Sequence, residues 1–566
     1  MLPIFRNVRY SSSGNAKSCI GVWRRTVSMY RDNVGSPSSV KYSSNSGTQN
    51  IKLLIDPKKV NEFSQLQLDL PVLSALKKAL PEVVKPTKVQ KNMLAALKSD
   101  LSVVVRSAPG AGKSLATALY VLSSMNPNEI SISHLILVPS EHLVEQYYDT
   151  ITKLLPNDAA VDDIVQRLYR ADSPIEQKQL QLLQTHKSPR IVVSTPTRIL
   201  DMLSSENRTL LPLQNLSCVA IDEADHLLPS EKYLKRSKSS ILSPKTSTRP
   251  PTDILMAHIT AWRATHMRRQ NKQLSPLRLI LESSTASSYL RKLAPGNNWI
   301  QQSPIVKVGL DEAGGIHTNR LPRDVDAYAV SYNPTTKKLR NSELPTLTVE
   351  EALLPDSSYG VRHKQKILPP QGERMYDSID AFARVFNLEQ RQRGILVIPP
   401  QLSAVMVREQ LENRGIRAAY SRLGQDGKNM VYHNSKGRRV ELKDPQTIFS
   451  KPQREGDPEV LIYDTQKALG LDFPGLSRVY LLTWSAVNNS SRKFLTIAGR
   501  CRLCPVHERG EQGRQGSWIP PTGQQRGKVI AIELDDETSE HINHQIALVM
   551  TKLDVEVGDY TKSVNI

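Results

Sequence analysis

Short runs of apolar residues recur along the chain, separated by segments long enough to form helices. Near-continuous runs of Val, Ile and Leu are typical of strands that are buried on both faces of a parallel sheet. Strands that alternate with helical segments indicate doubly wound α/β units. The runs fall into two series and so predict two such domains in tandem: 101–107, 133–140, 190–196, 217–222 and 277–285 in the first, and 394–400, 459–465, 478–484 and 528–534 in the second.

The domain organisation follows from these two series. A chain of 566 residues is too long for a single hydrophobic core, so length alone also favours two or more domains. We predict a first domain over 51–315 and a second over 376–566, joined by a junction at 316–375 that carries Pro, Lys and mixed polar residues. Three basic or polar stretches are predicted to be insertions: 229–276, 424–458 and 505–527.

The first residues of the chain have a composition of their own. Before Asp32 there are six Lys or Arg residues and no acidic residue, serine is frequent, and large apolar residues are interleaved with the arginines. This composition is typical of a mitochondrial transit peptide. We therefore predict a transit peptide and linker over 1–50 and a location in the mitochondrial matrix; the alternative is a basic tail that contacts nucleic acid.

The net charge points to a class of partner. Lys and Arg number 75 against 55 Asp and Glu, which gives a formal net charge of +20 at pH 7. Such an excess favours a polyanion, either nucleic acid or an anionic membrane surface. Four cysteines in a chain of this length do not indicate a disulfide framework. No run of about 18 apolar residues occurs, so no membrane-spanning segment is predicted.

The stretch "RSAPGAGKS" lies between a predicted strand and a predicted helix, which is the context that a nucleotide phosphate loop requires. Glycines let backbone N–H groups surround the phosphates, and the helix N-terminus adds partial positive charge. Lys113 can reach the β- and γ-phosphates, and Ser114 can bind Mg²⁺. The alternative is a chance turn, since the strict pattern has Gly where Ser107 stands. The predicted ATP-binding residues of this loop are Ser107, Ala108, Pro109, Gly110, Ala111, Gly112, Lys113 and Ser114.

Three carboxylates follow the apolar run 217–222, in the stretch "VAIDEADHLL". The Mg²⁺ of a bound triphosphate needs an acid at the end of a nearby strand, and Asp222 ends such a strand. Glu223 can orient and deprotonate the attacking water. The alternative for this acidic cluster alone is a helix N-cap or a solvated turn. Together with the phosphate loop it predicts a metal site of Ser114 and Asp222, with Glu223 as base.

The letters Asp-Glu-Ala-Asp at 222–225 belong to an ordered set of motifs. The set includes "KPTKVQ" (85–90), the phosphate loop, "PSEHLVEQ" (139–146), "TPTR" (195–198) and "SST" (283–285). In this order the sequence resembles the DEAD-box ATP-dependent RNA helicases from near Phe63 to the second series of strands. The resemblance implies an α/β fold of two RecA-like doubly wound parallel-sheet domains in tandem, here with basic insertions. It also implies ATP and Mg²⁺ as cofactors and RNA as the partner.

The resemblance implies roles for residues outside the phosphate loop. Gln90 would read the adenine edge, and Phe63 would stack on the ring. Asp225 would be bonded by Ser283 and Thr285, and these three residues would couple hydrolysis to RNA. The residues implied to hold the RNA backbone are Pro139, Ser140, Thr195, Pro196 and Arg198. The motifs depart from the family at Ser140, Glu141, His142 and Thr197.

The second domain matches the family less well. "DTQKALGLDFPG" (464–475) keeps the family's glycine and aspartate, and "TIAGRCRLC" (496–504) keeps one Gly-Arg pair. Arg500 is the implied arginine finger, which stabilises charge on the transferred phosphoryl group, and Arg502 is a second candidate. The implied ATP-binding residues of this domain are Gly470, Asp472, Arg500 and Arg502, and the implied catalytic set is Lys113, Asp222, Glu223 and Arg500. The departures are Leu469, Thr496, Ile497 and Leu503.

The transit peptide, the basic insertions and the degenerate second domain resemble one subgroup, the fungal mitochondrial DEAD-box helicases that assemble the large mitoribosomal subunit. That resemblance implies large ribosomal RNA as substrate, a mitoribosomal large-subunit precursor as partner and action as a monomer. The first hypothesis for function is therefore an RNA-dependent ATPase that remodels this RNA. The alternatives are an ATP-gated RNA clamp with little or no turnover and a DNA helicase or repair ATPase of the same superfamily.

Overall fold

The computed structural model describes residues between 53 and 564, so the predicted transit peptide and linker lie outside its described part. The gaps within this range are 82, 108–109, 127–130, 172, 187–188, 229–248, 271–275, 284–289, 291–292, 294–296, 298, 300–304, 310–320, 322–324, 349–369, 421–428, 434–438, 444–447, 450–452, 454–455, 469–472, 474, 488–489 and 502–525.

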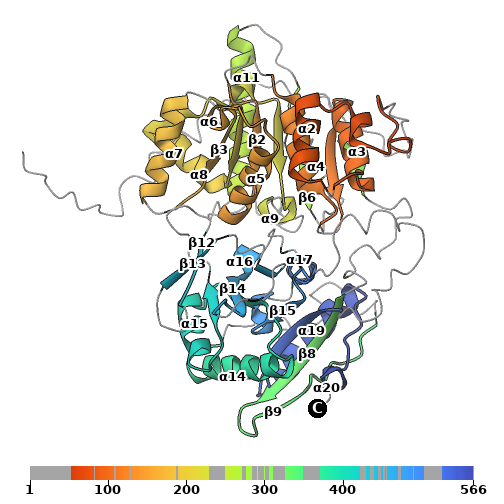
Figure 1. The fold of residues 1–566 in the computed structure, drawn as a ribbon, viewed down its shortest axis with the longest axis vertical. Helices are drawn as coiled ribbons and strands as arrows, with labels where there is room; N and C mark the ends of the chain where they lie inside the picture. The colour runs from red at the N-terminus through yellow and green to blue at the C-terminus, as the bar shows by residue number, and fades with distance from the viewer. Residues whose placement is uncertain are drawn as a thin grey trace, which may run out of the picture. The chain divides into compact units, whose positions relative to one another are not determined.

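The first domain is built on a seven-stranded, all-parallel sheet in the order β3-β4-β2-β5-β6-β1-β7 (Figure 1). All five apolar runs of the first series form strands of this sheet, as predicted. Their side chains are buried because helices cover both faces of a parallel sheet. The strands are β1 (Ser102–Arg106), β2 (His134–Leu137), β3 (Val165–Leu168), β4 (Ile191–Ser194), β5 (Cys218–Ile221), β6 (Arg278–Ser283) and β7 (Ile305–Val308).

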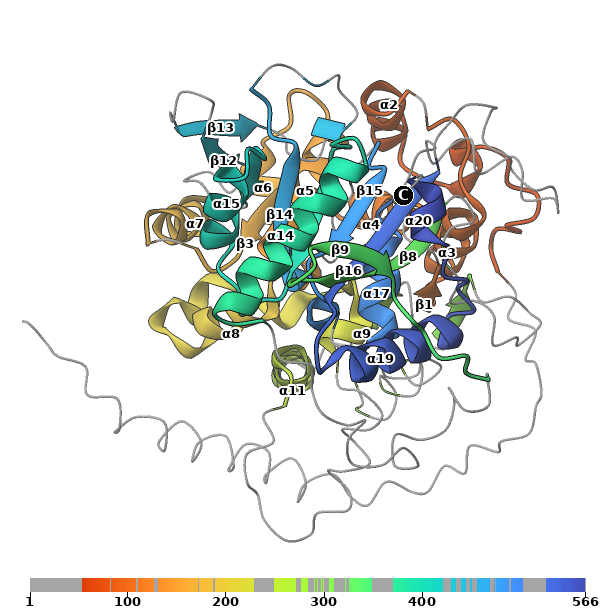
Figure 2. The ribbon, with the colours of Figure 1, turned by 90° about the horizontal axis from the view of Figure 1, so that it is seen from below.

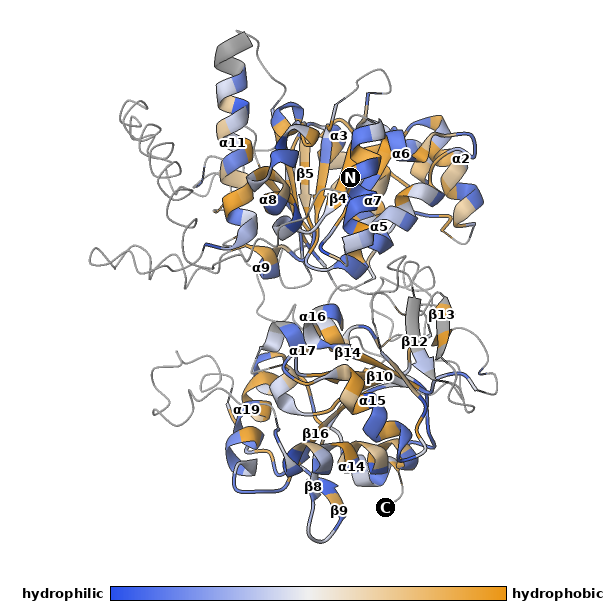
Figure 3. Cartoon of the chain, turned by 90° about the vertical axis from the view of Figure 1, so that its left-hand side faces the viewer, coloured by the Kyte–Doolittle hydropathy of each residue, from blue (hydrophilic) through white to orange (hydrophobic). Residues whose placement is uncertain are grey.

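Two layers of helices enclose this sheet, with apolar strands between helices whose outer faces are polar (Figure 3). One face packs against α2 (Leu70–Ala79), α3 (Lys88–Lys98), α4 (Lys113–Ser124) and α5 (Glu141–Lys153), and the other packs mainly against α8 (Pro196–Ser204) and α11 (Pro251–Gln270). The remaining helices are α6 (Val161–Ile164), α7 (Ser173–His186) and α9 (Ala224–Leu227). The sequence encodes several helix starts: Thr87 and Gln90 form a capping box on α3, Ser140 caps α5, and Pro196 begins α8.

The second domain holds a nine-stranded, mostly parallel sheet in the order β13-β12-β11-β14-β10-β15-β16-β8-β9. The second series of apolar runs forms β10 (Gly394–Ile398), β14 (Val460–Asp464), β15 (Arg478–Leu481) and β16 (Gly527–Leu534), as predicted. Five further strands were not predicted: β8 (Val325–Asn333), β9 (Lys338–Asn341), β11 (Ala418–Tyr420), β12 (Asn429–His433) and β13 (Arg439–Lys443). Figure 2 shows this domain from below.

Helices again cover both faces of the second sheet. One face packs against α14 (Glu373–Leu388), α15 (Ala404–Glu412) and α20 (Tyr560–Ser563), and the other packs against α16 (Thr465–Ala468), α17 (Ser491–Ala498) and α19 (Ser539–Lys552). None of the helices in the described part of the chain has the length and apolar character needed to cross a membrane.

The predicted junction at 316–375 is wrong as a boundary. β8 pairs in parallel with β16 along eight residues, from Val325 opposite Gly527 to Tyr332 opposite Leu534, and β9 pairs antiparallel with β8. The second domain therefore begins by residue 325. The run from 325 to 333 ("VDAYAVSYN") alternates small, polar and aromatic residues, so it lacks the Val, Ile and Leu signal that marks the other strands.

Two of the predicted insertions contain ordered elements. In 229–276, residues Pro251–Gln270 form α11, which buries Leu255, Met256 and Ile259 in the core of the first domain. In 424–458, β12 and β13 form an antiparallel hairpin that extends the second sheet next to β11. These parts are corrected from insertions to elements of the two domains. Residues 229–248, 271–275 and 505–525 of these stretches lie outside the described residues.

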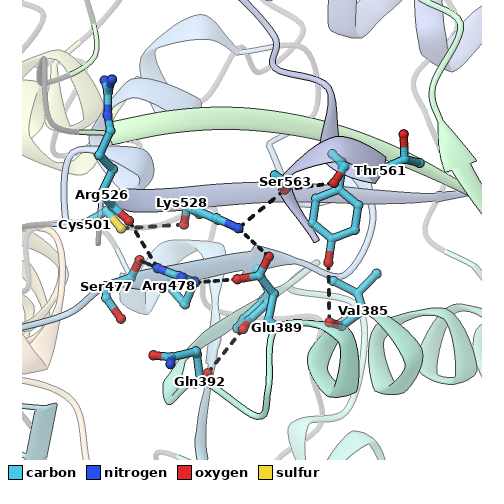
Figure 4. Close-up of polar contacts among 12 residues, drawn as sticks. Val385, Glu389, Gln392, Ser477, Arg478, Cys501, Arg526, Lys528, Thr561 and Ser563 are labelled. Atoms are coloured by element: carbon cyan, nitrogen blue, oxygen red, sulfur yellow. Dashed lines mark hydrogen bonds and ion pairs between the residues drawn. The ribbon is translucent and has the colours of Figure 1, made fainter. Parts of the chain in front are cut away.

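A buried polar network anchors the second sheet at the start of β15 and β16 (Figure 4). The carboxylate of Glu389 accepts hydrogen bonds from Arg478 Nε at 2.7 Å and from Lys528 Nζ at 2.8 Å. Lys528 also donates to the Ser563 hydroxyl at 3.4 Å, and its backbone oxygen accepts from Cys501 Sγ at 3.6 Å. Because a buried ion pair needs several partners to offset its desolvation, this network fixes how these strands pack. It also holds the residue that follows Arg500.

Candidate active site

The predicted catalytic motifs of the first domain meet at one edge of its sheet. β5, β6 and β1 are neighbours and run in parallel, so their carboxyl ends lie side by side. The acidic motif follows β5, Ser283 ends β6, and the phosphate loop follows β1. In open parallel sheets ligands bind outside the carboxyl ends of the strands. The fold therefore brings together residues that are far apart in the sequence.

The phosphate loop is braced by the start of α3. Gly110 and Gly112 have φ of 75° and 82°, which glycine adopts at low cost, and α4 begins at the next residue. The Thr87 hydroxyl donates to Ala111 O at 2.8 Å, and Gln90 Nε2 donates to Gly112 O at 3.1 Å. A Cβ at Gly112 would overlap the Gln90 amide. The glycine is thus required here both by its backbone conformation and by the close approach of Gln90.

The residues predicted to read the adenine lie against this loop and in the adjoining core. Gln90 is buried, and its Oε1 accepts the backbone N–H of Thr87 at 2.8 Å while its Nε2 bonds to Gly112. Phe63 is buried in the core at the start of a short 3₁₀ helix, η1 (Phe63–Leu66). These two bonds use one N–H and one lone pair of the Gln90 amide, which leaves one donor and one acceptor for an adenine edge.

The Lys113 side chain bonds to the phosphate loop and lies near three carboxylates. Its Nζ donates to Ser107 O at 2.9 Å, and the residue is buried. Burial lowers the pKa of the Lys113 ammonium, while Glu223, Asp222 and Glu282 act in the opposite direction. These carboxylates therefore favour the charged form, which a phosphate group requires.

The two predicted magnesium ligands face each other. The Ser114 hydroxyl donates to Asp222 Oδ2 at 3.3 Å, and the backbone N–H of Glu223 donates to Asp222 Oδ1 at 2.8 Å. Asp222 has an exposed fraction of 5%. A hydroxyl and a buried carboxylate at a phosphate loop are a donor set that Mg²⁺ accepts together with phosphate oxygens and water.

Glu223 is held in an uncommon backbone conformation. Its φ is 48°, in the left-handed region, and it precedes the first turn of α9. Non-glycine residues in this region cluster at functional sites because the surrounding structure has to hold them there. Burial raises the pKa of the Glu223 carboxyl, Asp222 and Asp225 raise it further, and Arg500 opposes this shift. A raised pKa suits a group that takes a proton from water.

Three buried polar atoms show whether the site suits a nucleotide with its metal. Ser107 Oγ, Glu223 Oε2 and Arg500 Nε are buried and have no hydrogen-bond partner among the described residues. Buried polar groups are normally paired, so groups of this kind favour a ligand with polar atoms. Two are donors that suit phosphate oxygens, and one is an acceptor that suits water. The residues present therefore fit ATP and Mg²⁺.

The coupling contact is present for the residue that the structure describes. The Ser283 hydroxyl donates to Asp225 Oδ1, which joins the end of β6 to the acidic motif, as expected for Ser283. Thr285 lies outside the described residues, as do Ala108 and Pro109 of the phosphate loop.

The predicted RNA-binding residues lie at two helix N-termini on the same sheet edge. Ser140 precedes α5 after β2, and Thr195 precedes α8 after β4, the strand next to β2. Helix N-termini present backbone N–H groups and partial positive charge to phosphates. Arg198, however, is buried, and its Nη1 lies 2.7 Å from Glu176 Oε2. Its guanidinium thus ties α8 to α7 in this structure.

Among the described residues of the second domain, Arg500 reaches the site. It follows the end of α17, and its Nη2 lies 3.5 Å from Glu223 Oε1. Thr496 and Ile497, which stand where the family has His and Arg, are fully buried in the domain core. Gly470, Asp472 and Arg502 lie outside the described residues.

Sequence reasoning missed three buried residues at this site: Thr117, Tyr147 and Glu282. Tyr147 OH lies 2.9 Å from Asp222 Oδ2 and 3.4 Å from Glu282 Oε2, and the Thr117 hydroxyl donates to Glu282 Oε1. A charged Glu282 inside the apolar run "LRLILESST" was the signal that could have revealed it. The pattern around Tyr147 carries no such signal.

Comparison with known families agrees with this geometry. Residues 87–261, less than half of the chain, match the model of the DEAD/DEAH box helicases. The first domain thus matches a DEAD/DEAH box helicase. The match covers the phosphate loop, the acidic motif and both predicted RNA motifs, and it supports the resemblance stated from those motifs.

Curated relatives such as DBP9 match less than a third of the chain. The ATP-dependent RNA helicase DBP9 of Coccidioides immitis is 33% identical over 182 residues, which cover 29% of this chain and 26% of DBP9. The chain thus spans about a quarter of the length of such relatives.

Solved structures extend the likeness to both domains. S. cerevisiae Dbp5 bound to RNA and ADP BeF3 has a TM-score of 0.52 at 16% identity, with 89% of this chain and 98% of that chain covered. Mss116p bound to ssRNA and AMP-PNP has a TM-score of 0.55 at 13% identity, with 90% and 80% covered. At these identities the likeness concerns the fold, and it confirms the predicted tandem of two RecA-like domains.

Proposed function

We propose that the protein is an ATP-dependent RNA helicase of the DEAD-box type. The observation that carries this proposal is the convergence of Lys113, Asp222 and Glu223 at one sheet edge, with Arg500 reaching Glu223 at 3.5 Å. Phosphate loop, metal carboxylate, base and arginine are the parts that phosphoryl transfer to water needs. The match of residues 87–261 to the helicase family supports the same reading.

The chain's own groups have distinct roles in this proposal. The backbone N–H groups at Gly110 and Gly112, together with Lys113, bind the phosphates, and Ser114 and Asp222 hold the metal. Bound Mg²⁺ would neutralise charge on the phosphate oxygens. Glu223 orients a water and accepts its proton, and Arg500 stabilises the charge that develops in the transition state.

The RNA would be held through its backbone. The N-termini of α5 and α8 offer N–H groups to successive phosphates, and the net charge of +20 favours a polyanion. Contacts to phosphates and 2′-hydroxyls carry little sequence information, so binding is sequence-tolerant and falls with salt.

The cellular substrate is large ribosomal RNA of mitochondria, in a large-subunit precursor, with the protein acting as a monomer in the matrix. This part of the proposal is supported by the acid-free, arginine-rich residues 1–31 and by the basic stretch at 229–276. A reporter fused to residues 1–50 should enter isolated mitochondria, whereas the same fusion with the six basic residues changed to Ala should not.

A second candidate, an ATP-gated RNA clamp, is favoured by one observation. At Thr496 and Ile497, where the family has His and Arg, the side chains are buried in the core of the second domain. Neither side chain carries a positive charge that could stabilise a phosphate. A site with fewer charged groups from the second domain would close on ATP and RNA yet turn over slowly.

Nucleotide-gated RNA binding tests the proposal. The affinity for a fluorescein-labelled single-stranded RNA would be measured by anisotropy with ADP and with ADP–beryllium fluoride, and again with DNA of the same sequence. We expect tighter binding to RNA with the triphosphate mimic and a steep loss with salt. Equal binding with both nucleotides, or preference for DNA, would contradict it.

A further inference from the structure

A third buried carboxylate lies beside the acidic motif, and the proposed chemistry does not use it. Glu282 is on β6, next to Ser283, and has an exposed fraction of 1%. Its Oε1 accepts a hydrogen bond from Thr117 on α4, and its Oε2 lies 3.4 Å from Tyr147 OH on α5. Burying a carboxyl group is costly unless its oxygens are bonded, and here both are.

The Tyr147 hydroxyl connects this carboxyl to the predicted metal ligand. It lies 2.9 Å from Asp222 Oδ2, closer than to Glu282, and Tyr147 is 2% exposed. A phenol has one proton and two lone pairs, so it can donate to Asp222 while a neighbour fixes its direction. The Asp222 carboxylate is thus held by three donors: the Ser114 hydroxyl, the Tyr147 hydroxyl and the Glu223 N–H.

Burial affects the protonation of both Glu282 and Tyr147. Burial raises the pKa of the Glu282 carboxyl, and the nearby Asp222 charge raises it further. Burial likewise raises the pKa of Tyr147, so its hydroxyl keeps its proton. Loss of a partner that orients a metal ligand typically lowers metal affinity by about 10- to 100-fold.

We propose that Tyr147 is a positioning residue for the magnesium carboxylate Asp222, and that Glu282, held by Thr117, fixes the direction of the Tyr147 hydroxyl. This inference rests on the proposed function, because it takes Asp222 to hold the Mg²⁺ of a bound nucleotide. The proposed network connects three elements to the metal site: α4, β6 and α5. The first residues of α5 follow the predicted RNA contact at Ser140.

The test is the Mg²⁺ dependence of nucleotide binding by the full chain. The fluorescence of a methylanthraniloyl-ADP would be titrated with Mg²⁺ in wild type, Tyr147→Phe and the control Tyr148→Phe. Tyr148 is the next residue on α5, and its ring packs under Arg167 at 4.4 Å, so this control also removes only a tyrosine hydroxyl. We expect Tyr147→Phe to raise the half-saturating Mg²⁺ about tenfold. Tyr148→Phe should leave it unchanged.

Variants at residue 282 separate positioning from general damage. The amide N–H of Glu282→Gln can donate to the Tyr147 oxygen and leaves the Tyr147 proton for Asp222, so half-saturating Mg²⁺ should stay within about twofold of wild type. Glu282→Leu has no polar atom that can bond to Tyr147, so it should behave like Tyr147→Phe. The Tyr147→Phe, Glu282→Leu double variant should show no further change, because both act through the same hydroxyl.

Failure of the inference and failure of the proposed function would give different results. Equal Mg²⁺ dependence of Tyr147→Phe and Tyr148→Phe, in variants with unchanged unfolding temperature, would overturn the inference but leave the proposed function standing. Wild-type protein that binds the nucleotide without any Mg²⁺ dependence would overturn both. Should Tyr147→Phe not fold, Thr117→Val replaces it, since it frees Glu282 and should raise half-saturating Mg²⁺ in the same direction.

Discussion

The guanidinium of Arg500, from the second domain, lies 3.5 Å from the carboxylate of Glu223, from the first. Both side chains are almost fully buried, and each carries a polar atom with no partner among the described residues. The predicted base and the predicted arginine finger therefore face each other. An attacking water and a transferred phosphoryl group are what these atoms are suited to bind.

Replacing Arg500 should separate binding from turnover. We expect Arg500→Ala to lower RNA-stimulated ATP hydrolysis about a thousandfold, because an arginine finger stabilises transition-state charge, while ADP affinity changes little. Steady-state phosphate release and equilibrium nucleotide binding measure the two effects. Arg340→Ala, which removes an arginine 52% exposed in a surface ion pair with Glu343, serves as the control and should leave both unchanged. Equal turnover in Arg500→Ala and Arg340→Ala would show that Arg500 is not the finger.

The close approach of Gln90 to Gly112 predicts an effect of a single methyl group. Gly112→Ala places a Cβ against the Gln90 amide and should weaken nucleotide binding at least about tenfold, or about 1.4 kcal/mol. Gly372→Ala is a matched control, because Gly372 also has positive φ and precedes a helix but has open space around its Cβ position. Unchanged nucleotide affinity in Gly112→Ala would mean that Gln90 does not brace the loop.

The buried strands and the first-domain motifs could be predicted because each carries its own local signal. Val, Ile and Leu runs mark strands covered on both faces, and the phosphate loop needs a fixed spacing of Gly, Lys and Ser. β8 could not be predicted, since its place beside β16 depends on pairing across the domain and its residues lack the apolar run. α11 was not predicted because it lies in a basic stretch, although Leu255, Met256 and Ile259 on one of its faces are buried in the core.

The hydrogen-bond network around Asp222 could not be predicted from the sequence, for a related reason. Tyr147 and Glu282 are far apart in the chain, and they meet because α5 brings Tyr147 to the residues at the carboxyl ends of β5 and β6. A buried glutamate in an apolar run could be noticed, but its partner could not be named.

Glu533 makes the stability of the second domain depend on pH. It is buried and accepts the backbone N–H of Trp484, and burial raises the pKa of its carboxyl to about 8, with Asp536 adding to the shift and the Trp484 N–H and Arg374 opposing it. A carboxyl whose folded pKa lies above its unfolded value stabilises the fold at low pH, and this contribution is lost as pH rises through about 8.

Glu533→Gln should therefore gain stability relative to wild type as pH rises. The amide still accepts from Trp484 but carries no charge to bury, so we expect a gain of at least about 1 kcal/mol between pH 5.5 and 8.5. Urea unfolding at the two pH values measures it, with the exposed Glu343→Gln as control. A gain that is the same at both pH values would show that Glu533 does not titrate in this range.

The basic stretch at 229–276 should contribute to RNA affinity. Changing Lys235, Arg236, Arg268 and Arg269 to Ala should weaken RNA binding and reduce the salt slope by about 0.7 for each lost phosphate contact. The control removes four exposed lysines elsewhere: Lys77, Lys78, Lys337 and Lys338. If both quadruple variants lose affinity and slope equally, the stretch provides only net charge.

The most direct test of the proposed function is ATP hydrolysis by the full chain, with and without RNA, beside Glu223→Gln. We expect turnover that RNA stimulates and that Glu223→Gln abolishes while ATP binding is kept, because the second domain delivers Arg500 to a site whose base is Glu223. Binding of ATP and RNA with no turnover above Glu223→Gln would contradict it, and the protein would then be an ATP-gated clamp.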